Sequence, residues 1–158
     1  QEWRSLEEGL LQRVRLLNHL LRDIYGPQTH IRDGSIPSSL VVGNPHFLRA
    51  CHGMHVPQGT YLHFMALDLA RAPDGRWWVV ADRTQSPSGA GYALENRLAI
   101  SRAFPDLFRD LKVQPLAPFF ATLRDSLAHW APGAAGKPLG MALSASTGAG
   151  QDLFVRLY

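Results

Sequence analysis

The chain has 158 residues, of which 46% are hydrophobic, which is enough for one domain with a hydrophobic core and excludes an intrinsically disordered tail. The formal net charge is only +3, the basic residues are scattered, and no apolar run approaches the ~20 residues of a membrane helix, so we expect neither a nucleic-acid partner nor a membrane span. A single cysteine, Cys51, excludes an internal disulfide and favours a reducing, cytoplasmic location.

The first predicted element is a helix over residues 5–25. Ser5 and Glu8 have the spacing of a capping box at its start, and Gly26 with Pro27 ends it. Apolar residues recur at intervals of three and four and predict one buried stripe: Leu6, Leu10, Val14, Leu17, Leu21 and Ile24. The opposite face is expected to be solvated and carries Glu7, Arg15, Arg22 and Asp23.

Residues 26–60 are rich in turn signals and predict loops. The short run "SSLVVG" within them fits either a strand or one helical turn. Four potential metal ligands follow within ten residues: His46, Cys51, His52 and His55. Their spacing fits no common structural zinc site, so we expect ordinary side-chain roles for them.

Two strands are predicted over residues 61–71 and 76–83, joined by the turn "APDG" into an antiparallel hairpin. The second strand, "RWWVVAD", is so apolar that we expect it to be covered on both faces. Trp77 and Trp78 are adjacent and therefore face opposite sides, where both are expected to be core residues.

Two acids lie near the ends of these strands, and the length of the turn decides which side chains they meet. With a three-residue loop, Asp68 shares a face with Asp82; with a four-residue loop, it shares a face with Ala81 and Arg83. Two carboxylates on neighbouring strands can hold Mg²⁺, with a nucleotide's phosphates at the remaining positions. The alternative is that these acids are simply salt-bridged or solvated.

A glycine-rich turn follows the second strand and leads into a predicted helix over residues 92–104. The backbone N–H groups of residues 88–91, including Ser88, Gly89 and Gly91, could receive an anion there. The alternative is that Ser88 only caps the helix. Arg97 and Arg102 on this helix could reach a phosphate or form surface salt bridges.

The rest of the chain predicts a short helix over residues 107–113, another over 115–130, and a strand over 153–158. Residues 131–140, "APGAAGKPLG", have the composition of a linker.

One long motif resembles a known family. Residues 66–97 read "ALDLARAPDGRWWVVADRTQSPSGAGYALENR" and closely resemble the circularly permuted ATP-grasp family of bacterial ligase-like proteins. The similarity extends over residues 2–130. It implies an α+β fold, with an antiparallel hairpin-centred sheet packed by helices, as part of an ATP-grasp-like architecture. The implied organisation is a partial domain at 1–130, a linker at 131–140 and an unassigned strand-containing tail at 141–158.

The resemblance also implies an activity, which is ATP-dependent ligation of a carboxylate to an amine through an acyl-phosphate. The cofactors would be ATP and magnesium, and the substrates small-molecule or peptide carboxylates and amines. The implied site residues are Asp68 and Asp82 for the metal, Ser88 and Gly89 for the nucleotide, and Arg97 for catalysis. We also expect Gly91 and Arg83 to contact the nucleotide.

Three positions depart from the family's pattern. Ala81 stands where the pattern has Glu, Arg83 where it has Asn, and Gln85 where it has Arg. An alanine cannot ligate a metal, and an arginine repels one. Family members are also longer, so we expect this chain alone not to catalyse ligation. The alternative function is a non-catalytic ATP-grasp-like module that binds a protein partner.

Overall fold

The computed structural model describes residues 2–85, 87–130, 141–146 and 152–157. These residues form helices and two-stranded antiparallel sheets, which confirms the predicted α+β class. The chain divides into two compact units. The first contains residues 1–63 and 69–78, and the second contains residues 64–68 and 79–158.

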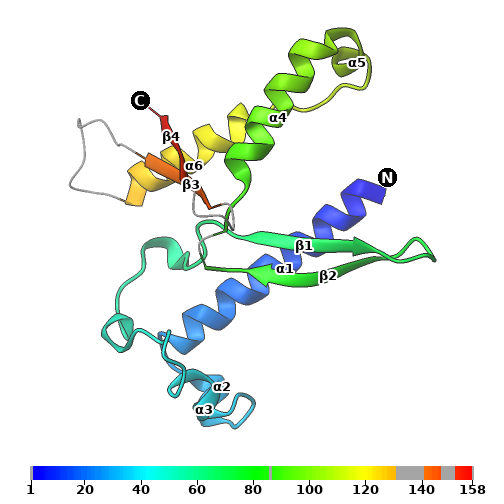
Figure 1. Cartoon of the computed structure of the whole chain (residues 1–158). Coiled ribbons are helices and arrows are strands. Elements are labelled where there is room, and N and C mark those ends of the chain that lie inside the picture. The colour runs from blue at the N-terminus through cyan, green and yellow to red at the C-terminus, as the bar shows by residue number, and fades with distance from the viewer. Residues whose placement is uncertain (1, 86, 131–140, 147–151, 158) are drawn as a thin grey trace. The chain divides into compact units, whose positions relative to one another are not determined.

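The first unit is built on one long helix, α1 (Glu2–Ile24), drawn in blue in Figure 1. All six residues of the predicted apolar stripe are half-buried, so the periodicity identified the packing face correctly. The helix begins before Ser5, which places Ser5 inside it, and the predicted capping box is therefore wrong. The chain turns directly after the helix, where the Gly26 N–H donates to the Asp23 carbonyl at 3.1 Å.

Asp23 was predicted to be solvated, but it is buried, with only 6% of the residue exposed. Its carboxylate accepts the backbone N–H groups of Thr29 (2.9 Å) and His30 (3.0 Å), and the His30 Nδ1 atom lies 3.2 Å away. Burial alone would raise the pKa of Asp23. The hydrogen bonds from His30 and Thr29 and the nearby imidazole lower it by more, so the pKa of Asp23 lies below its usual value. The return of the chain at Thr29 and His30 creates this environment, which helix periodicity does not encode.

Short helical turns follow: α2 (Thr29–Arg32), α3 (Ser38–Val41) and the 3₁₀ turns η1 (Arg49–Cys51) and η2 (Pro57–Gly59). The run "SSLVVG" therefore forms a helical turn, one of its two predicted possibilities. Aromatic rings hold this region together, since Tyr25 stacks on Phe47 at 5.2 Å and on Tyr61 at 6.3 Å between ring centroids.

The predicted hairpin consists of β1 (Ala66–Arg71) and β2 (Trp77–Arg83), paired with each other (Figure 1). The first strand is shorter than predicted. The second is not covered on both faces in the described chain, because Trp78 is 55% and Val80 is 66% exposed. The apolar composition of β2 predicted burial, but its only neighbouring strand within the described residues is β1.

Neither tryptophan of β2 is a core residue in the described part of the chain. The Arg71 guanidinium lies 5.6 Å from the Trp77 ring, and the Trp77 Nε1–H donates to the Glu2 carboxylate at 2.9 Å. The Arg76 guanidinium lies at the same distance from the Trp78 ring. Cation–π contacts thus take the place of the predicted apolar packing.

The second unit contains α4 (Ala90–Ala103), α5 (Pro105–Asp110) and α6 (Ala117–Trp130), all close to their predicted positions. Phe120 (5% exposed) and Leu123 (8%) on α6 are buried. The Phe119 ring contacts Phe64 at 5.6 Å and Phe120 at 5.2 Å between centroids. These rings form an aromatic cluster that attaches α6 to the segment leading into β1.

Two further strands, β3 (Met141–Ser146) and β4 (Asp152–Leu157), pair antiparallel with Met141 opposite Leu157. The sequence predicted β4 but not β3. The predicted linker at 131–140 lies outside the described residues. In the parts of the chain that the structure describes, no helix is long and apolar enough to cross a membrane.

Candidate functional site

The turn of the hairpin fixes how its strands meet. The Gly75 N–H donates to the Ala72 carbonyl at 2.9 Å, and the Ala72 N–H donates to the Arg76 carbonyl at 2.8 Å. Gly75 has a φ of +83°, the left-handed value that follows a type I turn in three-residue hairpin loops. The hairpin therefore has a three-residue loop, one of the two predicted lengths. Glycine as the last residue of this loop permits the left-handed backbone conformation.

The side chain that binds Asp68 is nevertheless Arg83, from the end of β2. The Arg83 Nε atom lies 3.0 and 2.9 Å from the two carboxylate oxygens, and Nη2 lies 2.7 Å from Oδ2. This is a charge-assisted pair that engages both oxygens of the acid. The hydrogen bonds from Arg83 lower the pKa of Asp68, and the same bonds raise the pKa of Arg83.

These contacts decide how well the predicted metal ligands fit a magnesium ion. Both oxygens of Asp68 are engaged by a permanent cation, and Ala81 has no side-chain donor atom. Asp82 is half-buried at the end of β2 and can supply one carboxylate. Magnesium is usually held by one or two carboxylates together with phosphates. A magnesium ion at Asp68 therefore does not fit the residues present, whereas Asp82 stays a possible ligand.

The glycine-rich turn leads into α4 through Gly89. Gly89 occupies the N-cap position of α4 with a φ of +98°, and no side chain caps the helix there. Ser88 is exposed and precedes this position, so the expectation that Ser88 simply caps the helix is wrong. At the start of α4, the Ala93 N–H donates to the Gly89 carbonyl at 3.0 Å. The N–H groups of residues 90–92 have no carbonyl partner within the helix, as at any helix start.

The helix α4 presents the rest of the predicted motif. Glu95 and Asn96 are exposed and Arg97 is half-buried. The Arg97 Nη1–H donates to the backbone carbonyl of Gln114, between α5 and α6. A guanidinium has five N–H donors, so this contact fixes Arg97 without exhausting its donors. Arg102 is exposed near the end of the helix.

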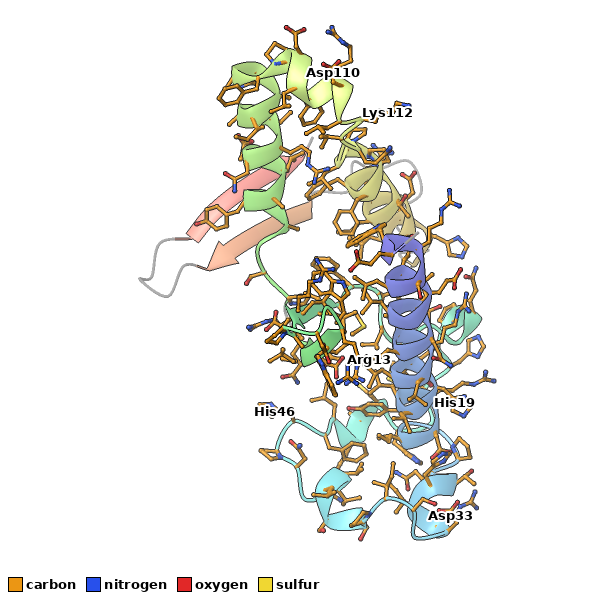
Figure 2. All side chains as sticks on the ribbon, turned by 90° about the vertical axis from the view of Figure 1, so that its right-hand side faces the viewer. Arg13, His19, Asp33, His46, Asp110 and Lys112 are labelled. Carbon is orange, nitrogen blue, oxygen red and sulfur yellow. The ribbon has the colours of Figure 1, made fainter. Side chains whose placement is uncertain are left out.

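Four potential metal ligands lie between residues 46 and 55, with Cys51 at the end of the 3₁₀ turn η1. Within the described chain, no group of three or more His, Cys, Asp or Glu side chains is placed to hold a metal ion. Figure 2 shows His46 on the loop that follows α3 and His19 on α1. Elsewhere in the first unit, the His19 ring contacts the His30 ring, with 6.3 Å between the centroids.

Asn18 is a residue that the sequence reasoning missed. It lies on the buried side of α1 and makes three hydrogen bonds to the segment before β1. The sequence did contain a signal for it, because Asn18 lies on the same face of the helix as Val14, Leu17 and Leu21 of the apolar stripe. An amide among apolar positions requires a hydrogen-bond partner.

Comparison with known proteins agrees with the hairpin motif. The family model for circularly permuted ATP-grasp type 2 matches residues 1–152. The chain belongs to this family. The match also continues past residue 130, where the resemblance recognised from the motifs ended.

Relatives of this ATP-grasp chain are found in several bacteria, and those described here are uncharacterised proteins. One from Synechocystis sp. is 42% identical over 131 residues, which cover 83% of this chain and 27% of that protein. One from Mycobacterium tuberculosis is 41% identical over 143 residues, covering 90% of this chain and 16% of that protein. One from Mycobacterium leprae is 40% identical over 126 residues, covering 80% and 22%. The chain thus spans 16% to 27% of the length of these relatives.

Proposed function

We propose that the full-length protein containing this chain is an ATP-dependent carboxylate–amine ligase, to which the chain contributes the hairpin and the glycine-rich turn. The observation that carries this proposal is the family match over residues 1–152, since ATP-grasp membership indicates an ATP-dependent, ligase-like function. The substrates would be a small-molecule or peptide carboxylate and an amine. The single cysteine favours a cytoplasmic location.

The proposed reaction has two steps. The carboxylate substrate attacks the terminal phosphorus of ATP, which gives an acyl-phosphate and ADP. The amine nitrogen then attacks the acyl carbon and loses a proton to the solvent, the C–O bond to phosphate breaks, and an amide and inorganic phosphate are formed. Both steps develop negative charge on phosphate oxygens, which fixed N–H donors and cations stabilise.

The chain offers such donors in its second unit. We propose that the backbone N–H groups from Ser88 to Gly91 bind a phosphate at the start of α4, where the glycine at position 89 leaves the approach open. We propose Arg97 as the catalytic residue that contacts the reacting groups with its remaining N–H donors. Asp82 is the proposed magnesium ligand of this segment.

We also propose that residues 1–130 are one part of a larger domain, followed by a linker at 131–140 and a tail at 141–158. Large apolar side chains of the hairpin support this, since Trp78 and Val80 are more than half exposed in the described chain. Trp78 and Val80 lie two residues apart on β2 and therefore on the same face, and adjoining exposed apolar side chains are typical of an interaction surface.

A second candidate function is a non-catalytic ATP-grasp-like module that binds a protein partner. The ion pair between Asp68 and Arg83 favours it, as does alanine at position 81. Both features remove metal ligands that an ATP-grasp enzyme would be expected to use.

Calorimetric titration of Mg-ATP into the full-length protein separates the two functions. A ligase binds the nucleotide, and Asp82→Asn weakens this binding because the metal loses a carboxylate. Asp68→Asn in the same titration tests the other predicted ligand. If folded wild-type protein takes up no nucleotide, the ligase proposal fails and the non-catalytic module is supported.

A further inference from the structure

The pair between Asp68 and Arg83 orients a cation at the end of the hairpin. The Arg83 Nε–H and one N–H of Nη2 face the Asp68 carboxylate. A guanidinium is planar and carries five N–H donors in a fixed arrangement. The two donors on Nη1 and the second donor on Nη2 therefore point away from Asp68.

Both side chains of the pair are accessible. The Arg83 side chain is 59% exposed and the Asp68 side chain is 41% exposed. An ion pair this exposed adds little to stability, because water solvates both charges well. The value of the pair lies in its geometry, since a bidentate contact holds the guanidinium plane in one orientation.

The same contact leaves Asp68 unsuitable for a metal ion. A magnesium ligand must present an oxygen lone pair to the ion, and Arg83 engages both oxygens of Asp68. A cation beside these oxygens would also repel the metal. Arg83 brings one positive charge to this end of the hairpin, where a magnesium ion would bring two.

We infer that Arg83 binds a phosphate group of the nucleotide in place of a magnesium ion at Asp68, and that Asp68 is a positioning residue for the Arg83 guanidinium. This inference rests on the proposed function, because it requires that the full-length protein binds ATP. Arginine suits this role, since its fork of N–H donors matches the oxygens of a phosphate.

The test is calorimetric titration of ATP into the full-length protein, in magnesium and in EDTA. Arg83→Gln removes the cation and should weaken ATP binding by about 10- to 100-fold, the usual effect of losing a charge-assisted hydrogen bond. Arg83→Lys keeps the charge without the fork and should lie between wild type and Arg83→Gln. Arg76→Gln is the matched control, because Arg76 is an exposed arginine of the same hairpin paired with Asp74 at 2.6 Å. Arg76→Gln should leave ATP binding unchanged.

Asp68→Asn separates positioning from metal ligation. If Asp68 positions Arg83, the variant weakens ATP binding by the same factor in magnesium and in EDTA, and it has no further effect in the Arg83→Gln background. Binding of Mn²⁺ to nucleotide-free protein, followed by electron paramagnetic resonance, should be equal in wild type and Asp68→Asn. A loss of Mn²⁺ binding in Asp68→Asn would overturn the inference.

The outcomes also distinguish this inference from the proposed function. If wild-type protein binds ATP and Arg83→Gln binds it equally well, the inference is wrong and the proposed function stands. If folded wild-type protein binds no ATP in either condition, both fail. Circular dichroism of each variant establishes that it is folded, and Arg83→Lys provides the test if Arg83→Gln does not fold.

Discussion

The Asn18 side chain of α1 holds the backbone of Tyr61, whose N–H donates to the Asn18 Oδ1 atom at 2.7 Å. The same oxygen accepts the Leu62 N–H at 3.1 Å, and Asn18 Nδ2–H donates to the Gly59 carbonyl at 2.9 Å. One amide thus fastens the segment between η2 and β1 to the long helix. These bonds are partly buried, so water replaces them poorly when the amide is removed.

We predict that Asn18→Ala destabilises this attachment by about 1–3 kcal/mol, the usual cost of leaving buried donors and acceptors unpaired. Amide hydrogen exchange at Tyr61 and Leu62 in the full-length protein measures it directly, and both amides should exchange faster. Asn18→Asp is the matched control, because it keeps the oxygen that accepts the Tyr61 and Leu62 N–H groups, while its second oxygen faces the Gly59 carbonyl and weakens that contact. Equal exchange at Tyr61 in wild type and Asn18→Ala would show that the bond does not hold the segment.

The second prediction concerns acid stability and Asp23. Its pKa is lower in the folded protein than the usual 3.8, so the folded state binds fewer protons than the unfolded state between the two pKa values. The stabilisation is therefore complete above about pH 3.8 and is lost as the pH falls through the folded pKa. We expect Asp23→Asn to be less stable than wild type at neutral pH and to lose less stability on acidification.

Thermal unfolding followed from pH 7 to pH 2 tests this prediction. The two curves should converge at low pH, where the wild-type carboxyl is protonated as well. Some acid sensitivity should persist in the variant, because the pKa values of Asp33 and Asp68 are also lowered in the folded chain. Parallel curves for wild type and Asp23→Asn would contradict the assignment.

A pair of glycines tests the backbone at the start of α4. Gly89 has a φ of +98°, and nothing lies within 4 Å of a Cβ added there, so the cost of Gly89→Ala is torsional. We expect a loss of about 1–2 kcal/mol in stability. Gly9→Ala is the control, because Gly9 lies inside α1 with equally open space around it. It should stabilise the protein by about 0.5–1 kcal/mol.

Thermal unfolding of both variants gives the comparison. Under the proposed function, Gly89→Ala also weakens ATP binding, because it changes the path of the N–H groups that follow, whereas Gly9→Ala does not. If the two substitutions have the same effect on stability, the left-handed backbone at Gly89 is not required.

Local patterns in the sequence predicted most elements, because each depends on neighbours along the chain. The stripe from Leu6 to Ile24 follows helix geometry, and the "APDG" turn follows the backbone preferences of proline and glycine. The strand β3 was missed, since its sequence, "MALSAS", lacks the β-branched and aromatic residues typical of strands.

The contacts between distant residues were harder to predict. Asp23 is on the polar side of α1, and only the return of the chain at Thr29 buries it. The sequence did not decide which side chain contacts Asp68, because the length of the turn does not show how far the long Arg83 side chain reaches. Trp78 was expected to be buried, but strand composition does not reveal which part of a protein provides the cover.

The aromatic cluster of the second unit gives the last prediction. Phe120 is 5% exposed, whereas the adjacent Phe119 is 42% exposed, although their rings are in contact. Truncating the buried ring removes more apolar area from the interior and leaves a cavity. We expect Phe120→Ala to cost about 3 kcal/mol and Phe119→Ala about 1 kcal/mol.

Hydrogen exchange along α6 is the suitable measurement, because it reports the opening of this one segment. Exchange should accelerate across α6 in both variants, and much more in Phe120→Ala. If Phe119→Ala proves the more damaging, then Phe119 is buried in the full-length protein by residues beyond those described. That result would place a neighbouring segment of the parent protein on this face of α6, because only new contacts can make an exposed ring costly to remove.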